Sequence, residues 1–291
     1  MLTLSAARRA RLRRSFDRAA AGFDDVATLP REIAKRMSER LALMRLPVRC
    51  VLDAGCGTGH GANLLRQRYR SALIIELDLS ERMLRHAARR RRLPWPLSGL
   101  PARRVTVCAD IQKLPLTAAS IDLVWSNLAL HWLEDLPAAF SQLHRVLRPG
   151  GLLMFSILGP DTLKELRAAS AGDAFHVNPH RDMHDIGDML VACGYADPVM
   201  DMEHVTLTYV DVPGLLRDLR AHGSIGLVEP QRKDLGGVGD YHSTLARYEQ
   251  FRRNDKRMPA TFEVIYGHAW KPQAKISPTG KRVIDIRSTQ A

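Results

Sequence analysis

The residues of this chain that are best placed to bind a ligand are one carboxylate and a set of alternating glycines. An apolar run ends at Asp53, and Gly55, Gly57 and Gly59 follow it at every second position. Glycines in this spacing after a strand let the backbone pass close to a bound molecule, because a Cβ atom would collide with it or would exclude the backbone angles required. The sequence therefore predicts a ligand cradled just beyond this strand.

Two kinds of nucleotide ligand are compatible with these glycines. The segment from Gly57 to Ala62 fits the loose G-x-G-x-x-A pattern of dinucleotide sites, which is a weak signal by itself. A pyrophosphate needs a helix N-terminus free of negative charge, whereas the amino group and sulfonium of S-adenosylmethionine are cationic and tolerate a carboxylate. Asp53 therefore favours S-adenosylmethionine over a dinucleotide.

Two more carboxylates follow, each at the end of an apolar run. Asp78 lies about 20 residues beyond the glycines, where an acidic side chain accepts hydrogen bonds from both ribose hydroxyls. Leu79 is then expected near the adenine. Asp110 and Ile111 end the next apolar run, at the position of a carboxylate that accepts from the adenine amine. This order of glycines and acids along the chain is the order that an S-adenosylmethionine site requires.

Asn127 and His131 follow a fourth apolar run and are candidates for the site of methyl transfer. We expect both side chains to border the methionine part of the cofactor. For His131, the alternative is a structural role in which both ring nitrogens are satisfied within the core.

Strands and helices must alternate to bring these residues to one edge of a sheet. Strand-like apolar runs occupy 51–53, 73–79, 105–109, 121–126 and 152–158. Residues 138–147 repeat apolar positions at helical spacing, and 148–151 break that helix. This alternation predicts a parallel sheet covered by helices on both faces.

The second half of the chain has a less regular pattern. We expect helices at 160–170, 183–193, 212–222 and 241–253, strands at 199–203, 205–210 and 261–270, and loops at 171–182 and 236–239. Asp182 is a favourable N-cap for the helix that Gly194 ends. Residues 273–291 are polar without periodicity and are expected to form a loose tail.

Longer segments carry a resemblance to known proteins. They are Ser15 to Asp24 (SFDRAAAGFD), Ser126 to Trp132 (SNLALHW), Gly159 to Arg167 (GPDTLKELR), Leu215 to Gly223 (LLRDLRAHG) and Met258 to Trp270 (MPATFEVIYGHAW). With the glycine motif, they make the core similar to class I S-adenosylmethionine-dependent methyltransferases. From about residue 15 to 272 the chain resembles the malonyl-acyl-carrier-protein O-methyltransferase family of biotin synthesis. One residue departs from that family, because Phe23 stands where a tyrosine is usual and a hydroxyl that can help to close the site is missing.

The resemblance implies a fold and a division of the chain. The fold is α/β and Rossmann-like: a mostly parallel seven-stranded sheet with helices on both faces, an N-terminal helical extension and a helical insertion near the C-terminus. We therefore expect a helical lid segment at 1–47, a methyltransferase domain at 48–272 and a polar tail at 273–291. An insertion at about 210–258 is expected to shape the substrate pocket.

The resemblance also implies a reaction, in which S-adenosylmethionine methylates the free carboxylate of a malonyl thioester on an acyl carrier protein. The product is the methyl ester that primes pimeloyl synthesis. A carboxylate of pKa about 4 is already ionised at pH 7, so it needs no general base and catalysis should rest on positioning and desolvation. The site then needs a cation to orient this carboxylate. By resemblance and charge the candidates are Arg217 and Arg220, whose alternative is a solvated helix surface.

The charge balance favours a polyanionic partner. The net charge is +12 and the pI is near 10.0, with the densest basic cluster at Arg89 to Arg92. An acidic acyl carrier protein with its phosphopantetheine arm fits this balance, although arginines at a helix end also simply oppose the helix dipole. Nucleic acid is disfavoured as a substrate, because residues 126–129 read Ser-Asn-Leu-Ala where amino-nitrogen methylation generally uses an Asn/Asp-Pro-Pro-aromatic turn.

Composition is that of an enzyme of the cytoplasm. No stretch reaches the roughly 18 uncharged apolar residues of a membrane span. The four cysteines lie in or beside apolar segments and not in a spaced disulfide framework, which is typical of a reducing compartment. The arginine-rich segment at 6–14 could pass for a transit peptide, but it runs directly into a segment that matches the family, so we expect a cationic first helix.

Histidines at 176, 180 and 184 are spaced by four residues, as metal ligands on a helix would be. Pro179 interrupts any helix there, and the inferred chemistry needs no metal. We therefore expect no metal site.

Other functions share parts of these patterns. A mitochondrial complex I assembly factor that hydroxylates a protein arginine also resembles the chain at 159–167 and 258–270, and other small-molecule or RNA methyltransferases share the core. A scaffold that retains the fold without catalysis would bind the cofactor weakly. The intact set of Asp53, Asp78 and Asp110 argues against such a scaffold.

Overall fold

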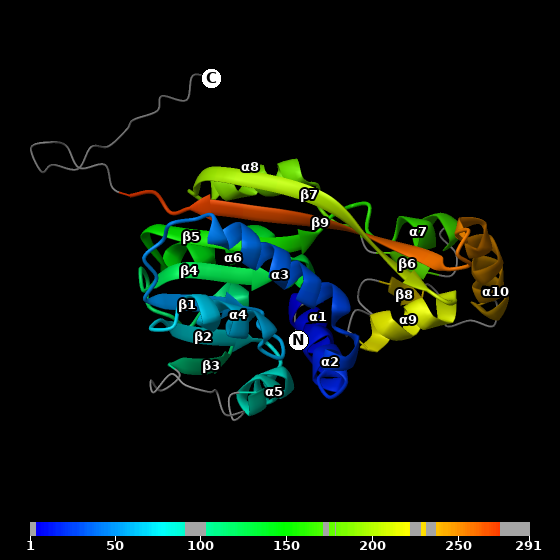
Figure 1. Cartoon of the computed structure of the whole chain (residues 1–291), viewed down its shortest axis with the longest axis horizontal. Helices are drawn as coiled ribbons and strands as arrows, with labels where there is room; N and C mark the ends of the chain where they lie inside the picture. Colours follow the sequence, from blue (N-terminus) through cyan, green and yellow to red (C-terminus); the bar gives the residue numbers. More distant parts are fainter. Residues whose placement is uncertain are drawn as a thin grey trace, which may run out of the picture.

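A sheet of seven strands forms the centre of the computed structural model (Figure 1). The structure describes residues 4–90, 103–170, 175–177, 179–221, 228–230 and 237–273. The strands are β1 (Cys50–Ala54), β2 (Leu73–Asp78), β3 (Arg104–Cys108), β4 (Ile121–Asn127), β5 (Leu147–Leu158), β7 (Ala196–Tyr209) and β9 (Met258–Trp270). They lie in the order β3-β2-β1-β4-β5-β9-β7; the first five are parallel, and β9 is antiparallel to both of its neighbours. The predicted mostly parallel, seven-stranded sheet is confirmed.

Helices cover both faces of this sheet. They are α3 (Thr28–Ala42), α4 (His60–Arg68), α5 (Glu81–Arg90), α6 (Leu136–Val146) and α8 (Met183–Ala192). Val51 and Leu123 belong to the core that contains α3 and α4, whereas their neighbours Leu52 and Val124 belong to the core that contains α6 and α8. Successive side chains of a strand point to opposite faces, so a strand covered on both faces must be apolar throughout.

The N-terminal helices lie against the carboxyl ends of the parallel strands. They are α1 (Leu4–Ala19), α2 (Phe23–Val26) and α3. Asp17 of α1 accepts a hydrogen bond from Ser80 Oγ at 2.6 Å, just after β2. Asp24 of α2 accepts one from Thr58 Oγ1 at 2.7 Å, just after β1. The helical extension is therefore joined by its polar side chains to the loops in which the glycines and acids lie.

Strands β7 and β9 extend beyond the ends of the other strands of the sheet. β9 pairs with β5 only from Val264 to Trp270, but it pairs with β7 from Met258 onward. Its first half therefore runs past the sheet into a lobe (Figure 1). The elements of that lobe are α7 (Lys164–Ser170), β6 (Phe175–Val177), α9 (Val212–Ala221), β8 (Val228–Pro230), α10 (Gly237–Tyr248) and the 3-10 turn η4 (Glu249–Phe251).

Some boundaries differ from those that the sequence predicts. The strands expected at 199–203 and 205–210 are one strand, β7, because the backbone of His204 between them pairs with Glu263. β6 lies within the expected loop at 171–182 and pairs with β8; each has three residues, too few for a periodic signal. α10 begins inside the glycine-rich segment that was expected to be a loop.

Parts of the predicted organisation fall outside the described residues. They include 91–92 of the arginine cluster and 274–291 of the expected tail. Within the described residues, no helix is both long enough and apolar enough to cross a membrane.

Candidate active site

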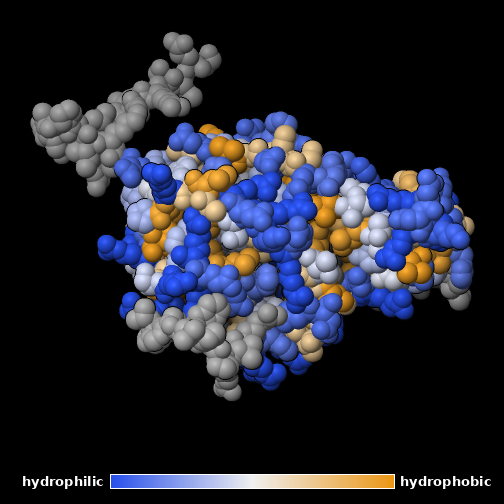
Figure 2. Space-filling model, in the orientation of Figure 1, coloured by the Kyte–Doolittle hydropathy of each residue, from blue (hydrophilic) through white to orange (hydrophobic). Residues whose placement is uncertain are grey.

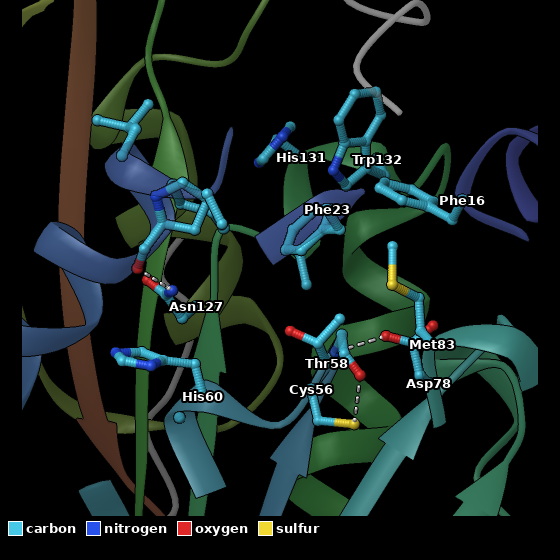
Figure 3. Close-up of a pocket in the computed structure, with 18 of the residues that line it drawn as sticks. Phe16, Phe23, Cys56, Thr58, His60, Asp78, Met83, Asn127, His131 and Trp132 are labelled. Atoms are coloured by element: carbon cyan, nitrogen blue, oxygen red, sulfur yellow. Dashed lines mark hydrogen bonds between the residues drawn. The ribbon is translucent and has the colours of Figure 1, made fainter. Parts of the chain in front are cut away.

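A pocket opens at the carboxyl ends of β1, β2 and β4, under the N-terminal helices (Figure 3). Nearly all of the predicted site residues line it: Asp53, Gly55, Gly57, Asp78, Leu79, Asp110, Ile111, Asn127 and His131. Gly59 does not line the pocket, although its neighbours on both sides, Thr58 and His60, do. The lobe closes the far side with Leu207, Tyr209 and Phe262. Figure 2 shows apolar side chains at the surface between the N-terminal helices and this lobe, with hydrophilic residues on either side.

The three alternating glycines are needed for two different reasons. All have positive φ angles, 80° for Gly55, 53° for Gly57 and 82° for Gly59, a region that other residues rarely adopt. A Cβ on Gly55 would lie 2.3 Å from Ala129 Cβ, and one on Gly59 would lie 2.7 Å from Glu76 Oε1, so these two are required by packing. Nothing described lies within 4 Å of a Cβ on Gly57. Only at Gly57 does the absent side chain leave open space for a ligand.

Asp78 organises the glycine loop as well as facing the pocket. Its Oδ2 accepts the backbone N–H of Gly57 at 2.9 Å, and its Oδ1 accepts that of Ser80 at 2.8 Å. Burial raises the pKa of this carboxyl, and backbone hydrogen bonds from Ser80, Gly57 and Leu79 oppose that rise. Each oxygen has a second lone pair, so the carboxylate can still accept from a ligand hydroxyl.

Asp53 and Trp125 supply two polar atoms that are buried without partners among the described residues, Oδ2 and Nε1. A Cβ on Gly61 would lie 3.1 Å from the first and 2.9 Å from the second, so both atoms face the same spot. Burial, and then the charge of Glu76, hold the pKa of Asp53 well above its ordinary value. A buried acceptor and a buried donor that are both unpaired are what a polar ligand would satisfy.

A buried ion pair supports the loop from behind. Arg104 pairs with Glu76 through both Nε and Nη2, and its Nη1 donates to Asn63 Oδ1 at 2.9 Å. The side chains of Arg104 and Glu76 are 2% and 0% exposed. Because Glu76 packs against Gly59, this pair holds the last turn of the cradle in place.

Asp110 lies at the rim and has partners of its own. Its Oδ1 accepts the backbone N–H of Gln112 at 2.9 Å, which caps the short turn that begins at Ile111. Its Oδ2 pairs with Arg9 of α1, also at 2.9 Å. The predicted adenine acceptor is therefore shared with the N-terminal helix.

Asn127 uses its amide to fix the start of α3. Its Nδ2 donates to the carbonyl of Pro30 at 2.9 Å, and its Oδ1 accepts from Ser156 Oγ at 2.9 Å. The sequence predicts this residue at the transfer site, and in the structure it lines the pocket. Its side-chain hydrogen bonds hold the backbone next to Arg31.

His131 is partly buried and lies beside a second histidine, His180, whose spacing in the sequence suggested only a metal ligand. Burial, and then His180, hold the pKa of His131 well below its ordinary value, and burial followed by Arg167 lowers the pKa of His180 to about 4. The rings are edge to face with centroids 5.7 Å apart, and His131 Nδ1 and His180 Nε2 have no partner among the described residues. Both imidazoles are therefore neutral at pH 7.

Aromatic rings enclose the middle of the pocket. Phe16 of α1 meets Trp132 edge to face with centroids 5.4 Å apart. Phe23 lies between the glycine loop on one side and His131 and Trp132 on the other (Figure 3). A tyrosine in its place would add a hydroxyl at the centre of this space, so Phe23 makes the chamber more apolar than the family pattern.

The prediction that Arg217 or Arg220 lies at the transfer site is not met by the structure. Neither lines the pocket, because α9 turns its apolar residues inward and both arginines are exposed. Within the described chain, Arg31 is the one arginine or lysine that does line it. Its Nη2 is 3.6 Å from Asp24 Oδ1, too far for a good hydrogen bond. No pattern in the sequence points to Arg31, since only the packing of α3 on β4 brings it here.

Of the histidines at 176, 180 and 184, the structure describes the side chains of His180 and His184, and these two have different neighbours. His184 is exposed and its Nδ1 is 2.6 Å from Asp182, whereas His180 faces His131. Elsewhere in the described residues, Asp161, His204 and Glu263 have ligand atoms within 4.8 Å of one another. Their mutual contacts explain that group: Glu263 Oε2 accepts the Asp161 N–H at 2.6 Å, and His204 Nε2 is 3.3 Å from Asp161.

Comparison with known proteins agrees with this geometry. Residues 52–155 match the methyltransferase domain family. The sheet is shared with phosphoethanolamine N-methyltransferase 2 of Haemonchus contortus, solved with S-adenosyl-L-methionine (TM-score 0.52, 17% identity, 88% of this chain and 57% of that chain), and with the cyclase SpnF (TM-score 0.51, 22% identity, 84% and 82%). At such identities they show the fold alone. The fold and the cradle define a class I methyltransferase.

Relatives that match over nearly the whole chain identify the family more narrowly than the shared fold does. Proteins named malonyl-acyl-carrier-protein O-methyltransferase are 54% identical in Methylovorus sp. strain MP688, over 96% of this chain and 95% of that protein, and 50% identical in Gallionella capsiferriformans, over 94% of each. The chain belongs to the malonyl-acyl-carrier-protein O-methyltransferase family.

Proposed function

We propose that this chain methylates the free carboxylate of a malonyl thioester carried by an acyl carrier protein, with S-adenosylmethionine as the donor and a methyl ester for biotin synthesis as the product. The observation that carries the proposal is the pocket. A cradle of glycines and acids opens into an apolar chamber in which, among the described residues, Arg31 is the one arginine or lysine.

The residues present fit the cofactor. Asp53 Oδ2 and Trp125 Nε1 have no partner among the described residues, so the first would accept from its ammonium group and the second would donate to its carboxylate. Asp78 would accept from the ribose, and Leu79 with Asp110 and Ile111 would hold the adenine. When bound, S-adenosylmethionine supplies an electrophilic methyl group on a sulfonium. The helices of the segment 1–47 would act as a lid, since Asp17 and Asp24 bind the loops below them.

The acceptor side requires orientation and not proton transfer. A malonyl carboxylate is ionised at neutral pH, and the neutral His131 has no proton to remove from it. We assign the orienting cation to Arg31, whose backbone neighbour Pro30 is held by Asn127. One carboxylate oxygen would be held while the other attacks, and Phe23, Trp132 and Phe262 would exclude water from the chamber.

The partner would be drawn by charge. The net charge of +12 suits an acidic carrier protein, whose approach it would accelerate. The thioester would then enter between the N-terminal helices and the lobe, where apolar side chains reach the surface (Figure 2).

The test of the proposal is methyl transfer by the purified chain. Methyl-labelled S-adenosylmethionine is incubated with malonyl-carrier protein, with acetyl-carrier protein, which lacks a free carboxylate, and with RNA. We expect base-labile label on the malonyl protein alone. Label on RNA, or equal label on the acetyl protein, contradicts the proposal.

Arg31→Gln tests the orienting cation. If the site is desolvated, kcat/KM for the malonyl protein should fall by about 2 to 4 kcal/mol in transition-state stabilisation, or roughly 30- to 700-fold, and Arg31→Lys should fall less. Affinity for S-adenosylmethionine should change little. The matched control is Lys35→Gln, an exposed cation one turn further along α3. Loss of cofactor affinity with an unchanged KM for the malonyl protein would show that Arg31 holds the cofactor instead.

A further inference from the structure

A second cavity lies where the ends of α1 and α9 meet, outside the pocket described above. Its lining consists of Ser15, Arg18, Ala19, Gly22, Arg217, Arg220 and Ala221. The three arginines are exposed. None of them has a hydrogen bond or ion pair with another described residue. Within the part of the chain that the structure describes, three cations without an anionic partner thus surround one cavity.

The arginines converge because both helices are amphipathic. α9 buries Val212, Leu215, Leu216 and Leu219, one apolar face of the helix, which leaves Arg217 and Arg220 together on the opposite face. In α1, Leu12 and Phe16 line the main pocket, whereas Ser15, Arg18 and Ala19 line the second cavity.

The same two helices therefore form walls of both cavities. Leu219 of α9 lines the main pocket, and its neighbour Arg220 lines the second cavity. Likewise, Phe23 lines the first and Gly22 the second. The two cavities are therefore neighbours along α1 and α9, and a ligand long enough to extend from one to the other would contact both helices.

Charge decides what the second cavity can accept. Arg18 and Arg220 lie in the last turns of their helices, where each helix end carries roughly half a negative charge. The three full positive charges of the arginines exceed the two partial negative charges of these helix ends. The acids nearest in sequence, Asp17 and Asp218, do not line the cavity, and their side chains are hydrogen-bonded to Ser80 Oγ, at 2.6 Å, and to Tyr209; the charged side chains of the lining are the three arginines. The local balance favours an anion, and the guanidinium fork is the group that best matches a phosphate.

We infer that Arg18, Arg217 and Arg220 bind the phosphodiester of the carrier protein's phosphopantetheine arm and thereby direct its thioester into the main pocket. The inference rests on the proposed function, because it takes the malonyl-carrier protein as the substrate. The arm has a phosphate at one end and the thioester at the other. An anion site outside and an acceptor pocket inside, sharing their walls, are two fixed points for such a ligand. The arginines that the sequence assigned to the carboxylate thus act on the other end of the same substrate.

The experiment separates the phosphate from the rest of the substrate. Wild type and Arg217→Gln/Arg220→Gln are assayed with malonyl-phosphopantetheine and with malonyl-pantetheine, which lacks the phosphate. Arg18→Gln is assayed in the same way. The matched control is Arg82→Gln/Arg85→Gln, which removes two exposed charges from α5. Malonyl-carrier protein and malonyl coenzyme A, which both carry a phosphate at this position, are measured alongside.

For wild type, kcat/KM should be at least about tenfold higher with the phosphate than without it, as one charge-assisted contact would give. In the double variant this ratio should approach one, with turnover of malonyl-pantetheine unchanged and the control variant unaffected. Lysine at both positions should restore part of the ratio. If wild type shows no preference for the phosphate, or if the double variant keeps it, the inference is overturned. Methylation of all four substrates would then leave the proposed function intact, whereas methylation of none of them would remove the proposed function itself.

Discussion

Replacement of Asp78 by asparagine separates the two tasks of this carboxylate. In the structure Oδ2 accepts from Gly57 N at 2.9 Å and Oδ1 from Ser80 N at 2.8 Å. Asparagine has the same shape but only one acceptor oxygen, so its NH2 group must face one of these two N–H donors. Asp78→Asn therefore removes a charge and brings two donors together. The glycine loop and the proposed ribose contact are both affected.

The two effects have separate magnitudes. A hydrogen bond to a charged group contributes about 1.5 to 3 kcal/mol, so loss of the one to the glycine loop should lower the free energy of unfolding of the cofactor-free protein by about that amount. Loss of the ribose contact should weaken binding of S-adenosylmethionine by a similar free energy, which is about 12- to 150-fold in Kd.

Calorimetric titration and urea unfolding of the same preparations measure both quantities. Asp188→Asn, an exposed residue of α8, is the control and should change neither. A Kd within twofold of wild type would refute the placement of the ribose at Asp78. A lower affinity without any change in unfolding would refute the role of Asp78 in holding the loop.

Three further predictions concern stability and salt. His180, with its pKa lowered to about 4, stays neutral in the folded chain, while the unfolded chain takes up a proton below about pH 6.5. The free energy of unfolding should therefore fall by about 1.5 kcal/mol between pH 6.5 and 5. Urea unfolding of His180→Gln should show a smaller fall with pH, and an equal fall would count against this explanation. Arg104→Met leaves Glu76 buried without its ion-pair partner and should lower the free energy of unfolding by about 3 to 5 kcal/mol. The double variant Glu76→Leu/Arg104→Met should show a smaller decrease in the free energy of unfolding. Equal decreases for the two variants would disprove the ion-pair explanation. Added salt should reduce turnover of malonyl-carrier protein far more than turnover of a small malonyl thioester. The reason is that the attraction between a chain of net charge +12 and an acidic carrier protein is screened beyond about 10 Å at 0.1 M salt. Equal salt dependence for the two substrates would exclude electrostatic recruitment.

The parts of the site that the sequence predicts are those that lie next to one another in sequence. Asp53 is the last residue but one of β1, and Gly55 and Gly57 directly follow the strand, so their positions in the pocket depend only on local structure. Asp78 follows the neighbouring parallel strand, and the carboxyl ends of parallel strands meet at one edge. These relations hold without knowledge of how the rest of the chain packs.

The place of Arg31 in the pocket could not be predicted in that way, whereas the exposed positions of Arg217 and Arg220 could. The apolar spacing of Leu215, Leu216 and Leu219 already indicated that Arg217 and Arg220 would lie on the outer face of their helix. The inward position of Arg31 had no such signal. It depends on where α3 crosses the end of β4, which the bond between Asn127 and Pro30 determines across 97 residues of sequence.

The place of β9 in the sheet has a consequence for the order in which the chain can fold. β9 lies between β5 and β7, so β7 has no neighbour in the sheet until residues 258–270 have been made. During synthesis, β1 to β5 can assemble as each strand emerges, but β5 keeps an open edge and the wall formed by Tyr209 and Phe262 is absent. A cofactor cradle can therefore exist on the ribosome before any acceptor chamber does. Loss of the strand at 258–270 is then expected to leave β5 as an unpaired edge strand that is prone to aggregation, and not a smaller working enzyme.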